Sequence, residues 1–250
     1  MEATLSQLES PAAAAAHGRR PCQLHKFGRV RYQDAWALQR QWVELRRAGE
    51  IPDRLLLLEH PPVITLGRNA RREHLLSCPE MLAAEGIEVV ETNRGGDVTF
   101  HGPGQLVGYP ILDLSAIRKD VVWYVRTLEE AIIRTLIDLG LAAGRRAGMT
   151  GVWVGDGKVA AIGIHISRWI TSHGFALNVE TDLGCFRHIV PCGIASHPVT
   201  SLEELLGAPV DRASLENELA FHLGELLGLE MEWTTRQSSE RRERCLPPMC

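Results

Sequence analysis

Apolar residues recur at steps of three and four residues in three stretches of the chain, which is the spacing of one helix face. The longest stretch, 121–139, follows Asp120. A second, 35–48, follows Asp34, and a third follows Asp211. An aspartate in such a position can accept hydrogen bonds from the free N–H groups of the first helical turn. The pattern therefore predicts three long helices, each capped by an aspartate.

Short apolar runs bounded by turn residues predict strands. They cover residues 54–59, 63–66, 87–91, 106–112, 152–154, 159–166 and 175–179. Short helices are predicted at 79–85 and after Ser201, which forms a capping box with Glu204. Strands and helices mix without strict β-α-β alternation. This order is typical of an α+β fold in which helices pack on a mixed β-sheet.

An Asp-Gly pair, Asp156-Gly157, separates the strands predicted at 152–154 and 159–166. Because glycine adopts a positive φ at no steric cost, the pair predicts a tight hairpin turn with Gly157 in that conformation. Lys158 then begins the second strand.

Residues 94–105 contain four glycines, at 95, 96, 102 and 104. We expect this density to prevent regular structure and to let backbone N–H groups approach a ligand. A plain connection between two strands is the alternative interpretation.

Length and charge narrow the class of protein. A chain of 250 residues can bury a full core, and we expect one domain at 23–233 between a mobile arm, 1–22, and a loose tail, 234–250. The net charge of −4 argues against nucleic acid as a partner. No apolar run approaches the roughly 20 residues of a membrane span, and residues 1–21 lack the pattern of a secretory signal. We therefore expect no membrane association.

The six cysteines form no C-x-x-C pair and no regular framework, which indicates free thiols in the reducing cytoplasm and argues against a metal site. Cys192 lies between a rigid proline and a permissive glycine, where a thiol can be held still and approached closely. It is either a reactive thiol or a buried structural one. Lys158 is by default a solvated surface lysine, but an amine beside a thiol would activate it.

Arg94, His101 and His173 each stand next to a glycine. A histidine there could orient a substrate or exchange a proton, although a hydrogen-bonded structural role is the simpler interpretation. The chain has no G-x-S-x-G elbow, Walker A loop or G-x-G-x-x-G motif, so the usual serine nucleophile and phosphate cradles lack their sequence signals.

Four motifs in order resemble the lipoyl(octanoyl) transferases, the octanoyl-[acyl-carrier-protein]:protein N-octanoyltransferases. They are RGGDVTFHGPGQ at 94–105, GKVAAIG at 157–163, HGFALNV at 173–179 and PCG at 191–193. The resemblance runs from about residue 55 to about residue 206 and includes EHPP at 59–62 and Gly67-Arg68. Asp97 stands where the family usually has glutamine, and Phe100 where it often has tyrosine.

The resemblance implies the fold of the biotin protein ligase and lipoate-protein ligase catalytic domains. It also implies a catalytic acyl-thioester on Cys192 with Lys158 beside it, and no cofactor or metal. The implied substrate-binding residues are Arg94, Gly95, Gly96, Asp97, Val98, Thr99, Phe100, His101, Ala161, Ile162, Gly163, Gly174, Phe175 and Ala176.

The implied donor is octanoyl-acyl carrier protein. The implied acceptors are lysines in the lipoyl domains of 2-oxoacid dehydrogenases and of the glycine cleavage H protein, in the first step of endogenous lipoate biosynthesis. Exchange of one thioester for another needs no ATP, which agrees with the missing phosphate loop. Basic clusters at Arg68, Arg71 and Arg72, and at Arg145 and Arg146, could dock the acidic carrier or simply form a solvated face.

Two other functions remain open. An ATP-dependent lipoate or biotin ligase of the same fold would adenylate its acid and would not need Cys192. A non-catalytic lipoyl-domain binding protein would form no acyl-enzyme, and replacement of Lys158 or Cys192 would not affect it.

Overall fold

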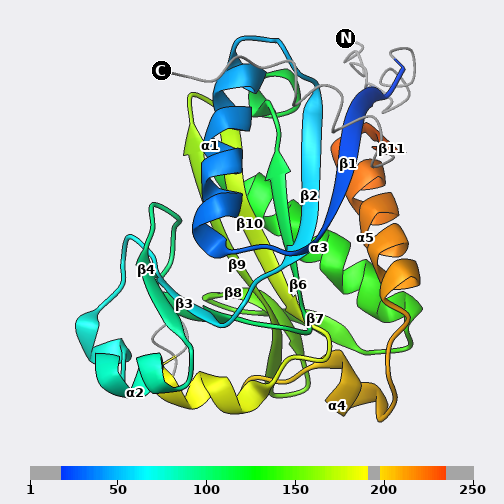
Figure 1. The fold of residues 1–250 in the computed structure, drawn as a ribbon. Helices are drawn as coiled ribbons and strands as arrows, with labels where there is room; N and C mark the ends of the chain where they lie inside the picture. The colour runs from blue at the N-terminus through cyan, green and yellow to red at the C-terminus, as the bar shows by residue number, and fades with distance from the viewer. Residues whose placement is uncertain (1–17, 191–197, 235–250) are drawn as a thin grey trace, which may run out of the picture.

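The computed structural model describes residues 18–190 and 198–234 (Figure 1). Within these ranges, an eight-stranded sheet of order β11-β1-β2-β6-β10-β9-β8-β7 lies beside a three-stranded sheet of order β4-β3-β5. In the large sheet, β1 pairs in parallel with both β2 and β11, whereas the pairs from β2 through β7 are antiparallel. This mixed sheet with packed helices confirms the predicted α+β class.

The strands are β1 (Arg20–Arg29), β2 (Asp53–Glu59), β3 (Val63–Leu66), β4 (Glu88–Glu91), β5 (Val98–His101), β6 (Gln105–Ile111), β7 (Ala143–Arg146), β8 (Met149–Val154), β9 (Gly157–Ser167), β10 (Ile170–Asn178) and β11 (Leu229–Trp233). The α-helices are α1 (Tyr32–Arg47), α2 (Pro79–Ala84), α3 (Val121–Asp138), α4 (Leu202–Leu206) and α5 (Arg212–Leu227). Short 3₁₀ helices are η2 (Arg72–His74), η3 (Leu114–Ala116) and η4 (Leu183–His188). None of the helices in these ranges is both long and apolar enough to span a bilayer.

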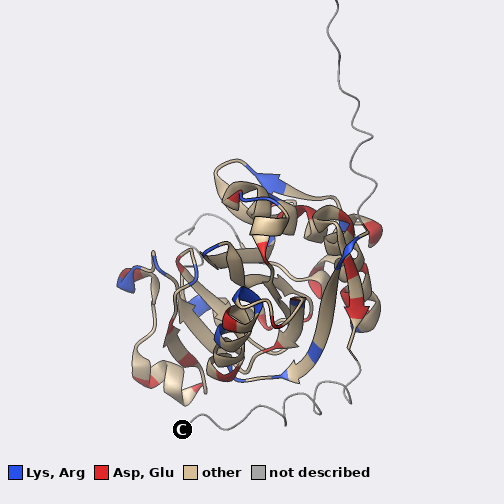
Figure 2. Ribbon diagram, turned by 90° about the horizontal axis from the view of Figure 1, so that it is seen from above, with Lys and Arg blue, Asp and Glu red and all other residues tan. Residues whose placement is uncertain are grey.

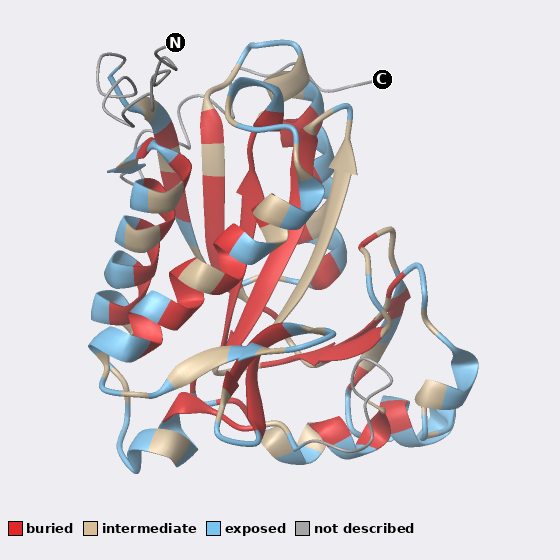
Figure 3. Cartoon of the chain, turned by 180° about the vertical axis from the view of Figure 1, so that it is seen from behind, coloured by how far each residue is buried: buried red, intermediate tan, exposed pale blue. Residues whose placement is uncertain are grey.

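The large sheet is buried on both faces. Alternate residues of a strand point to opposite faces, so Leu55 and Leu57 pack with α3 and α5, while Leu56 and Leu58 pack with α1. Figure 1 shows α1 on one side of the sheet and α3 and α5 on the other, and Figure 3 shows buried residues along the central strands. Burial on both faces explains why β2 is a continuous apolar run.

The predicted N-terminal caps are confirmed at three helices. The side chains of Asp120, Ser201 and Asp211 accept hydrogen bonds from backbone N–H groups at the starts of α3, α4 and α5. The prediction for Asp34 is wrong, because α1 begins earlier, at Tyr32, whose side chain is buried. Asp34 lies within the first turn, where its charge still favours the helix dipole.

The hairpin prediction is confirmed, but its turn differs by one position. Val154 pairs with Gly157, so the turn residues are Gly155 and Asp156, and Gly155 carries the positive φ of 55°. Gly157 instead packs against Thr200, where a β carbon would lie 2.7 Å from the Thr200 methyl group.

Four strands were not predicted from the sequence pattern: β1, β5, β7 and β11. β1 begins at Arg20, before the predicted domain boundary at residue 23, and Cys22 is fully buried between β2 and β11. Residues 20–22 therefore belong to the sheet rather than to an arm. The rest of the expected arm, up to residue 17, and the tail from residue 235 lie outside the described residues.

Candidate functional site

Small residues form a trough across two neighbouring strands. Ala161 pairs with Ala176, and Gly163 pairs with Gly174, in the antiparallel register of β9 and β10. Residues directly opposite each other in such a register point to the same face, so four small residues leave that face without side-chain bulk.

The glycine-rich stretch lies over this trough. Gly95 donates its N–H to the carbonyl of Ile164 on β9 (2.8 Å), and a β carbon on Gly163 would lie 3.0 Å from the Gly95 carbonyl oxygen. The stretch is more regular than expected, because β5 (Val98–His101) forms inside it and pairs with β3. The glycines lie at the ends of the stretch, and one of them, Gly95, allows its backbone to approach β9 closely.

Alternation along β5 divides the predicted substrate-binding residues. Asp97, Thr99 and His101 line the cavity above the trough. Val98 and Phe100 face the opposite side and pack in the core of the small sheet, where Phe100 contacts the Phe186 ring. The period of two would have indicated this division if the stretch had been identified as a strand.

The cavity between the trough and β5 opens to solvent, and the empty space within it and at its mouth is about 440 Å³. The predicted residues that line it are Arg94, Gly96, Asp97, Thr99, His101, Ala161, Ile162, Gly163, Gly174, Phe175 and Ala176. Gly95 lines the adjoining open groove instead. The structure thus brings together segments from three separate motifs.

Arg94 is buried at the cavity wall. Its guanidinium donates to the hydroxyl and carbonyl oxygens of Thr65 on β3 (2.6–3.0 Å) and to the Gly95 carbonyl (3.1 Å). These bonds tie the first residue of the glycine-rich stretch to the small sheet. Arg94 therefore shapes the cavity as well as lining it.

Three residues that the sequence did not single out belong to a buried polar network: Tyr32 and Tyr109, which line the cavity, and His60, which contacts both. His60 Nδ1–H donates to the carbonyl of Val30 (2.7 Å), so its Nε2 accepts from the Tyr109 hydroxyl (2.8 Å). Tyr32 lies parallel to the His101 ring, with centroids 6.0 Å apart. His60 stands in the EHPP motif, which was a signal for it; Tyr32 had none.

The two predicted histidines join this network. His101 Nδ1–H donates to Gln105 Oε1 (2.7 Å), and the Gln105 amide donates to Asn178 Oδ1 (2.9 Å). His173 has a positive φ of 55° within β10, and its backbone N–H donates to Gln39 Oε1 (2.7 Å). A positive φ is uncommon for a residue other than glycine, and this one is held by a buried side chain from α1.

The network is electrically neutral near pH 7. Burial lowers the pKa of His60 to about 4 and that of His173 to about 3, and burial together with His60 holds the pKa of His101 well below its usual value. Burial raises the pKa of Tyr32 to about 12. Neutral rings beside the small-residue trough suit an apolar ligand.

Lys158, the second residue of β9, is buried and only 7% exposed, so the interpretation as a solvated surface lysine is wrong. It lines a smaller cavity of about 300 Å³ that shares Thr99, Ala161 and Ala176 with the first one. Its Nζ lies 5.7 Å from the centre of the Trp153 ring. The side chain thus lines a cavity that adjoins the larger one.

Cys192 lies outside the described residues, as do Pro191 and Gly193. The described chain ends at Val190 and resumes at Pro198, and both residues are hydrogen-bonded to other segments. Val190 donates its N–H to the carbonyl of His74 (2.8 Å), and Lys158 donates its N–H to the carbonyl of Pro198 (2.9 Å). Among the described cysteines, Cys22 and Cys185 have pKa values raised mainly by burial, which disfavours their thiolates.

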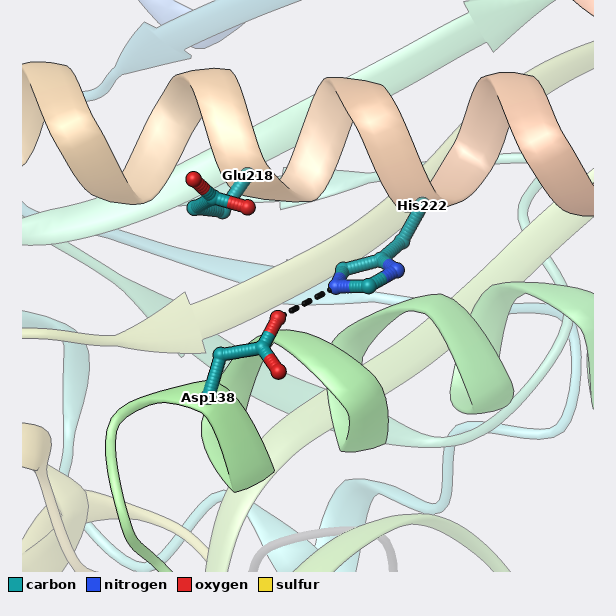
Figure 4. Close-up of side chains that lie close together, drawn as sticks. All are labelled: Asp138, Glu218 and His222. Atoms are coloured by element: carbon teal, nitrogen blue, oxygen red, sulfur yellow. Dashed lines mark hydrogen bonds and ion pairs between the residues drawn. The ribbon is translucent and has the colours of Figure 1, made fainter.

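One group of potential metal ligands occurs in the described ranges, away from the cavity. Asp138 on α3 and Glu218 and His222 on α5 bring ligand atoms within 4.8 Å of one another (Figure 4). His222 Nε2–H already donates to Asp138 Oδ2 (2.6 Å), and both carboxylates are exposed. Exposed groups of this kind are common without an ion, so we assign no metal to them.

The chain matches the lipoyl protein ligase A/B catalytic domain family over residues 31–224. The octanoyltransferase of Solibacter usitatus is 53% identical over 212 residues, which cover 85% of this chain and 96% of that protein. The octanoyltransferase of Chloroflexus aurantiacus is 50% identical over 214 residues, or 84% of this chain and 96% of that protein.

Solved structures agree on the fold. A lipoate-protein ligase A bound with ATP superposes with a TM-score of 0.66 at 16% identity, covering 90% of this chain and 93% of that one. A biotin protein ligase from Aquifex aeolicus with biotin and ATP has a TM-score of 0.51 at 14% identity, covering 82% and 70%. At these identities the likeness concerns the fold alone, whereas identities of 50% or more over most of both chains establish the family. The chain therefore belongs to the octanoyltransferases, a family of acyltransferases that share the lipoyl protein ligase A/B catalytic domain.

Proposed function

We propose that this protein transfers an octanoyl group from octanoyl-acyl carrier protein to a lysine of a lipoyl domain, through a thioester on Cys192. The observation that carries the proposal is the position of Lys158. Its side chain is buried in the smaller cavity, which shares Thr99, Ala161 and Ala176 with the larger one, and its backbone is hydrogen-bonded to Pro198 and Thr200, directly after the segment that contains Cys192.

In the first step the Cys192 thiolate attacks the donor thioester carbonyl. The bond from carbon to the carrier sulfur breaks, the acyl group remains on Cys192, and the carrier leaves as a thiol after it takes up the proton of the Lys158 ammonium. A nearby ammonium group favours the thiolate, and Lys158 supplies that charge.

In the second step the amine of the acceptor lysine attacks the Cys192 thioester. An amide forms, the carbon–sulfur bond to Cys192 breaks, and the proton lost by the amine goes to the departing thiolate. Lys158, once deprotonated, can accept and pass on this proton as a general base. An amide is more stable than a thioester, so the transfer needs no ATP.

The cavity would hold the octanoyl chain. We retain as its binding residues Arg94, Gly95, Gly96, Asp97, Val98, Thr99, Phe100, His101, Ala161, Ile162, Gly163, Gly174, Phe175 and Ala176. Val98 and Phe100 would act from the core behind β5, by holding Asp97, Thr99 and His101 in register. The neutral histidine network would add no charge of its own against the alkyl chain.

Donor docking is best supported at Arg71 and Arg72. Both are exposed, together with Arg68, and Arg71 lines the open groove beside the cavity. The second basic cluster is engaged elsewhere: Arg145 pairs with Glu129 and Glu130, and Arg146 pairs with Asp156. Charges of both signs are spread over the elements in Figure 2, so the attraction would be local.

The proposed reaction also implies acceptor proteins, a cellular location and the extent of the catalytic domain. The acceptors would be the lipoyl domains of 2-oxoacid dehydrogenases and the glycine cleavage H protein, and the site of action would be the cytoplasm, where the free cysteines stay reduced. The catalytic domain would extend from β1 to β11.

Intact-protein mass spectrometry after mixing with octanoyl-acyl carrier protein, without ATP, tests the proposal. We expect a hydroxylamine-labile octanoyl adduct on the wild type, a weak one on Lys158→Ala, and no thioester on Cys192→Ser. Modification of a lipoyl domain only with ATP and free octanoate would instead identify a ligase. Binding to a lipoyl domain without any adduct would identify a non-catalytic protein.

A further inference from the structure

His74 connects two segments that lie far from each other in the sequence. Its Nδ1–H donates to Asp97 Oδ2 (2.5 Å), at the cavity wall. Its backbone carbonyl accepts from the N–H of Val190 (2.8 Å), and the next residues continue this pairing through a bridge between Leu75 and Ile189. One residue therefore contacts both the glycine-rich stretch and the chain that leads to Cys192.

Asp97 is itself firmly held. Its Oδ1 accepts from the backbone N–H groups of Val98 (2.8 Å) and Arg71 (3.2 Å), and its side chain is 13% exposed. Its backbone carbonyl also accepts from Gly67 N–H (3.2 Å). A carboxylate with these contacts is a fixed point to which the His74 imidazole is attached.

The second end of the Cys192 segment has its own anchor. Pro198 accepts from the N–H of Lys158, and Thr200 N–H donates to the carbonyl of Lys158 (3.0 Å). Residues 191–197 thus join two anchored points, Val190 at His74 and Pro198 at Lys158.

From this arrangement, and on the basis of the proposed function, we infer that His74 is a positioning residue for acyl transfer. Its imidazole, through Asp97, fixes residues 188–190 relative to the cavity and so sets the distance between the thiol and the acyl carbonyl. The role assigned to His74 is indirect. It acts through the chain that enters the Cys192 segment.

Loss of the His74 imidazole should change the rate of Cys192 acylation rather than the binding of the donor. The Asp97 bond to Arg71 N–H does not depend on His74, so the exposed arginines keep their position when the imidazole is lost. Displacement of a nucleophile by about 1 Å can slow a reaction by about 100-fold. We therefore expect loss of the imidazole to lower the maximal rate of Cys192 acylation and to leave the KM for the donor nearly unchanged.

The test measures single-turnover acylation of Cys192 by octanoyl-acyl carrier protein in the full chain, using quenched samples and intact-protein mass spectrometry. His74→Leu removes the hydrogen bond, and His74→Asn keeps a donor where Nδ1 stands. His222→Leu is the matched control, because it removes the same kind of imidazole–carboxylate bond, to Asp138, away from the cavity. Circular dichroism monitors folding, and His74→Phe replaces His74→Leu if the latter does not fold.

We expect His74→Leu to acylate about tenfold or more slowly, His74→Asn to recover most of the rate, and His222→Leu to match the wild type. Wild-type rates in folded His74→Leu, or a His74→Asn variant as slow as His74→Leu, would overturn the inference. The double variant His74→Leu/Asp97→Asn gives a further test. Both substitutions break the same hydrogen bond, so the double variant should be no slower than the slower single variant, and rate losses that multiply would contradict the inference. A wild type that forms no adduct refutes the proposed function instead.

Discussion

Gly151 on β8 leaves the space that the side chain of Lys158 occupies. A β carbon at position 151 would lie 2.5 Å from Lys158 Cε, 3.2 Å from Nζ and 2.6 Å from the carbonyl oxygen of Ala160. Gly151 also has a φ of 132° and donates its N–H to the fully buried Glu129 (2.9 Å). The buried lysine therefore depends on a glycine in the neighbouring strand.

Gly151→Ala should slow acylation of Cys192 by about tenfold or more, because the added methyl group forces the Lys158 ammonium out of its place in the smaller cavity. The rate of adduct formation by mass spectrometry checks this. Gly144→Ala, on the adjacent strand β7 with no atom within 4 Å of the added carbon, is the control. Equal rates in the two variants would show that Lys158 does not depend on this contact.

Gly174→Ala should destabilise the fold itself. A β carbon there would lie 2.2 Å from the Gly108 carbonyl oxygen and 2.7 Å from Pro110 Cδ, both on β6, so side-chain rotation cannot relieve the overlap. We expect the free energy of unfolding to fall by about 1–3 kcal/mol or more in urea titrations. Gly28→Ala, where nothing lies within 4 Å, should stay near the wild type. A wild-type urea midpoint for Gly174→Ala would contradict this packing.

The buried histidines should make stability depend on pH. The pKa of His60 is about 4 and that of His173 about 3 in the folded protein, whereas both groups titrate near pH 6.5 when unfolded. Below pH 6.5 the unfolded chain binds more protons, so the free energy of unfolding falls as the pH drops towards 4. Above pH 6.5 this penalty is absent. Each group should contribute on the order of 1–3 kcal/mol at the acid end of this window.

Urea unfolding at pH 7, 5.5 and 4.5 measures this dependence. His60→Asn keeps a donor for the Val30 carbonyl but has no group that titrates, so its stability should decline less steeply than that of the wild type. Identical slopes for the two proteins would mean that His60 is not the source.

Charge reversal at Arg71 and Arg72 should slow acyl loading and flatten its dependence on salt, because exposed charges steer an acidic carrier mainly through the association rate. Loading rates at several sodium chloride concentrations measure both effects. Lys119→Glu with Arg134→Glu makes the same change in net charge at exposed residues outside the proposed docking segment and serves as the control. Unchanged loading by Arg71→Glu/Arg72→Glu would exclude docking at this segment.

Secondary structure was predicted correctly where the residues that specify an element lie within that element. The helix after Asp120 could be predicted because its cap and its apolar stripe lie within 20 residues of sequence. The strand β5 was missed because its flanking glycines dominated the pattern, and its pairing with β3 depends on residues more than 30 positions away. The cap at Asp34 failed because burial of Tyr32, a tertiary effect, extended the helix.

The sequence by itself determined the fold class, the family and most of the cavity lining, because family motifs and local periodicity are written in consecutive residues. Only the tertiary structure decided that Lys158 is buried, that Val98 and Phe100 face the core, and that Tyr32 meets His173 across 141 positions. The same holds for the tie between His74 and Asp97, 23 residues apart. Such contacts depend on the register of the strands and on which faces of the strands and helices other elements cover. Both are fixed only when segments distant in the sequence pack together.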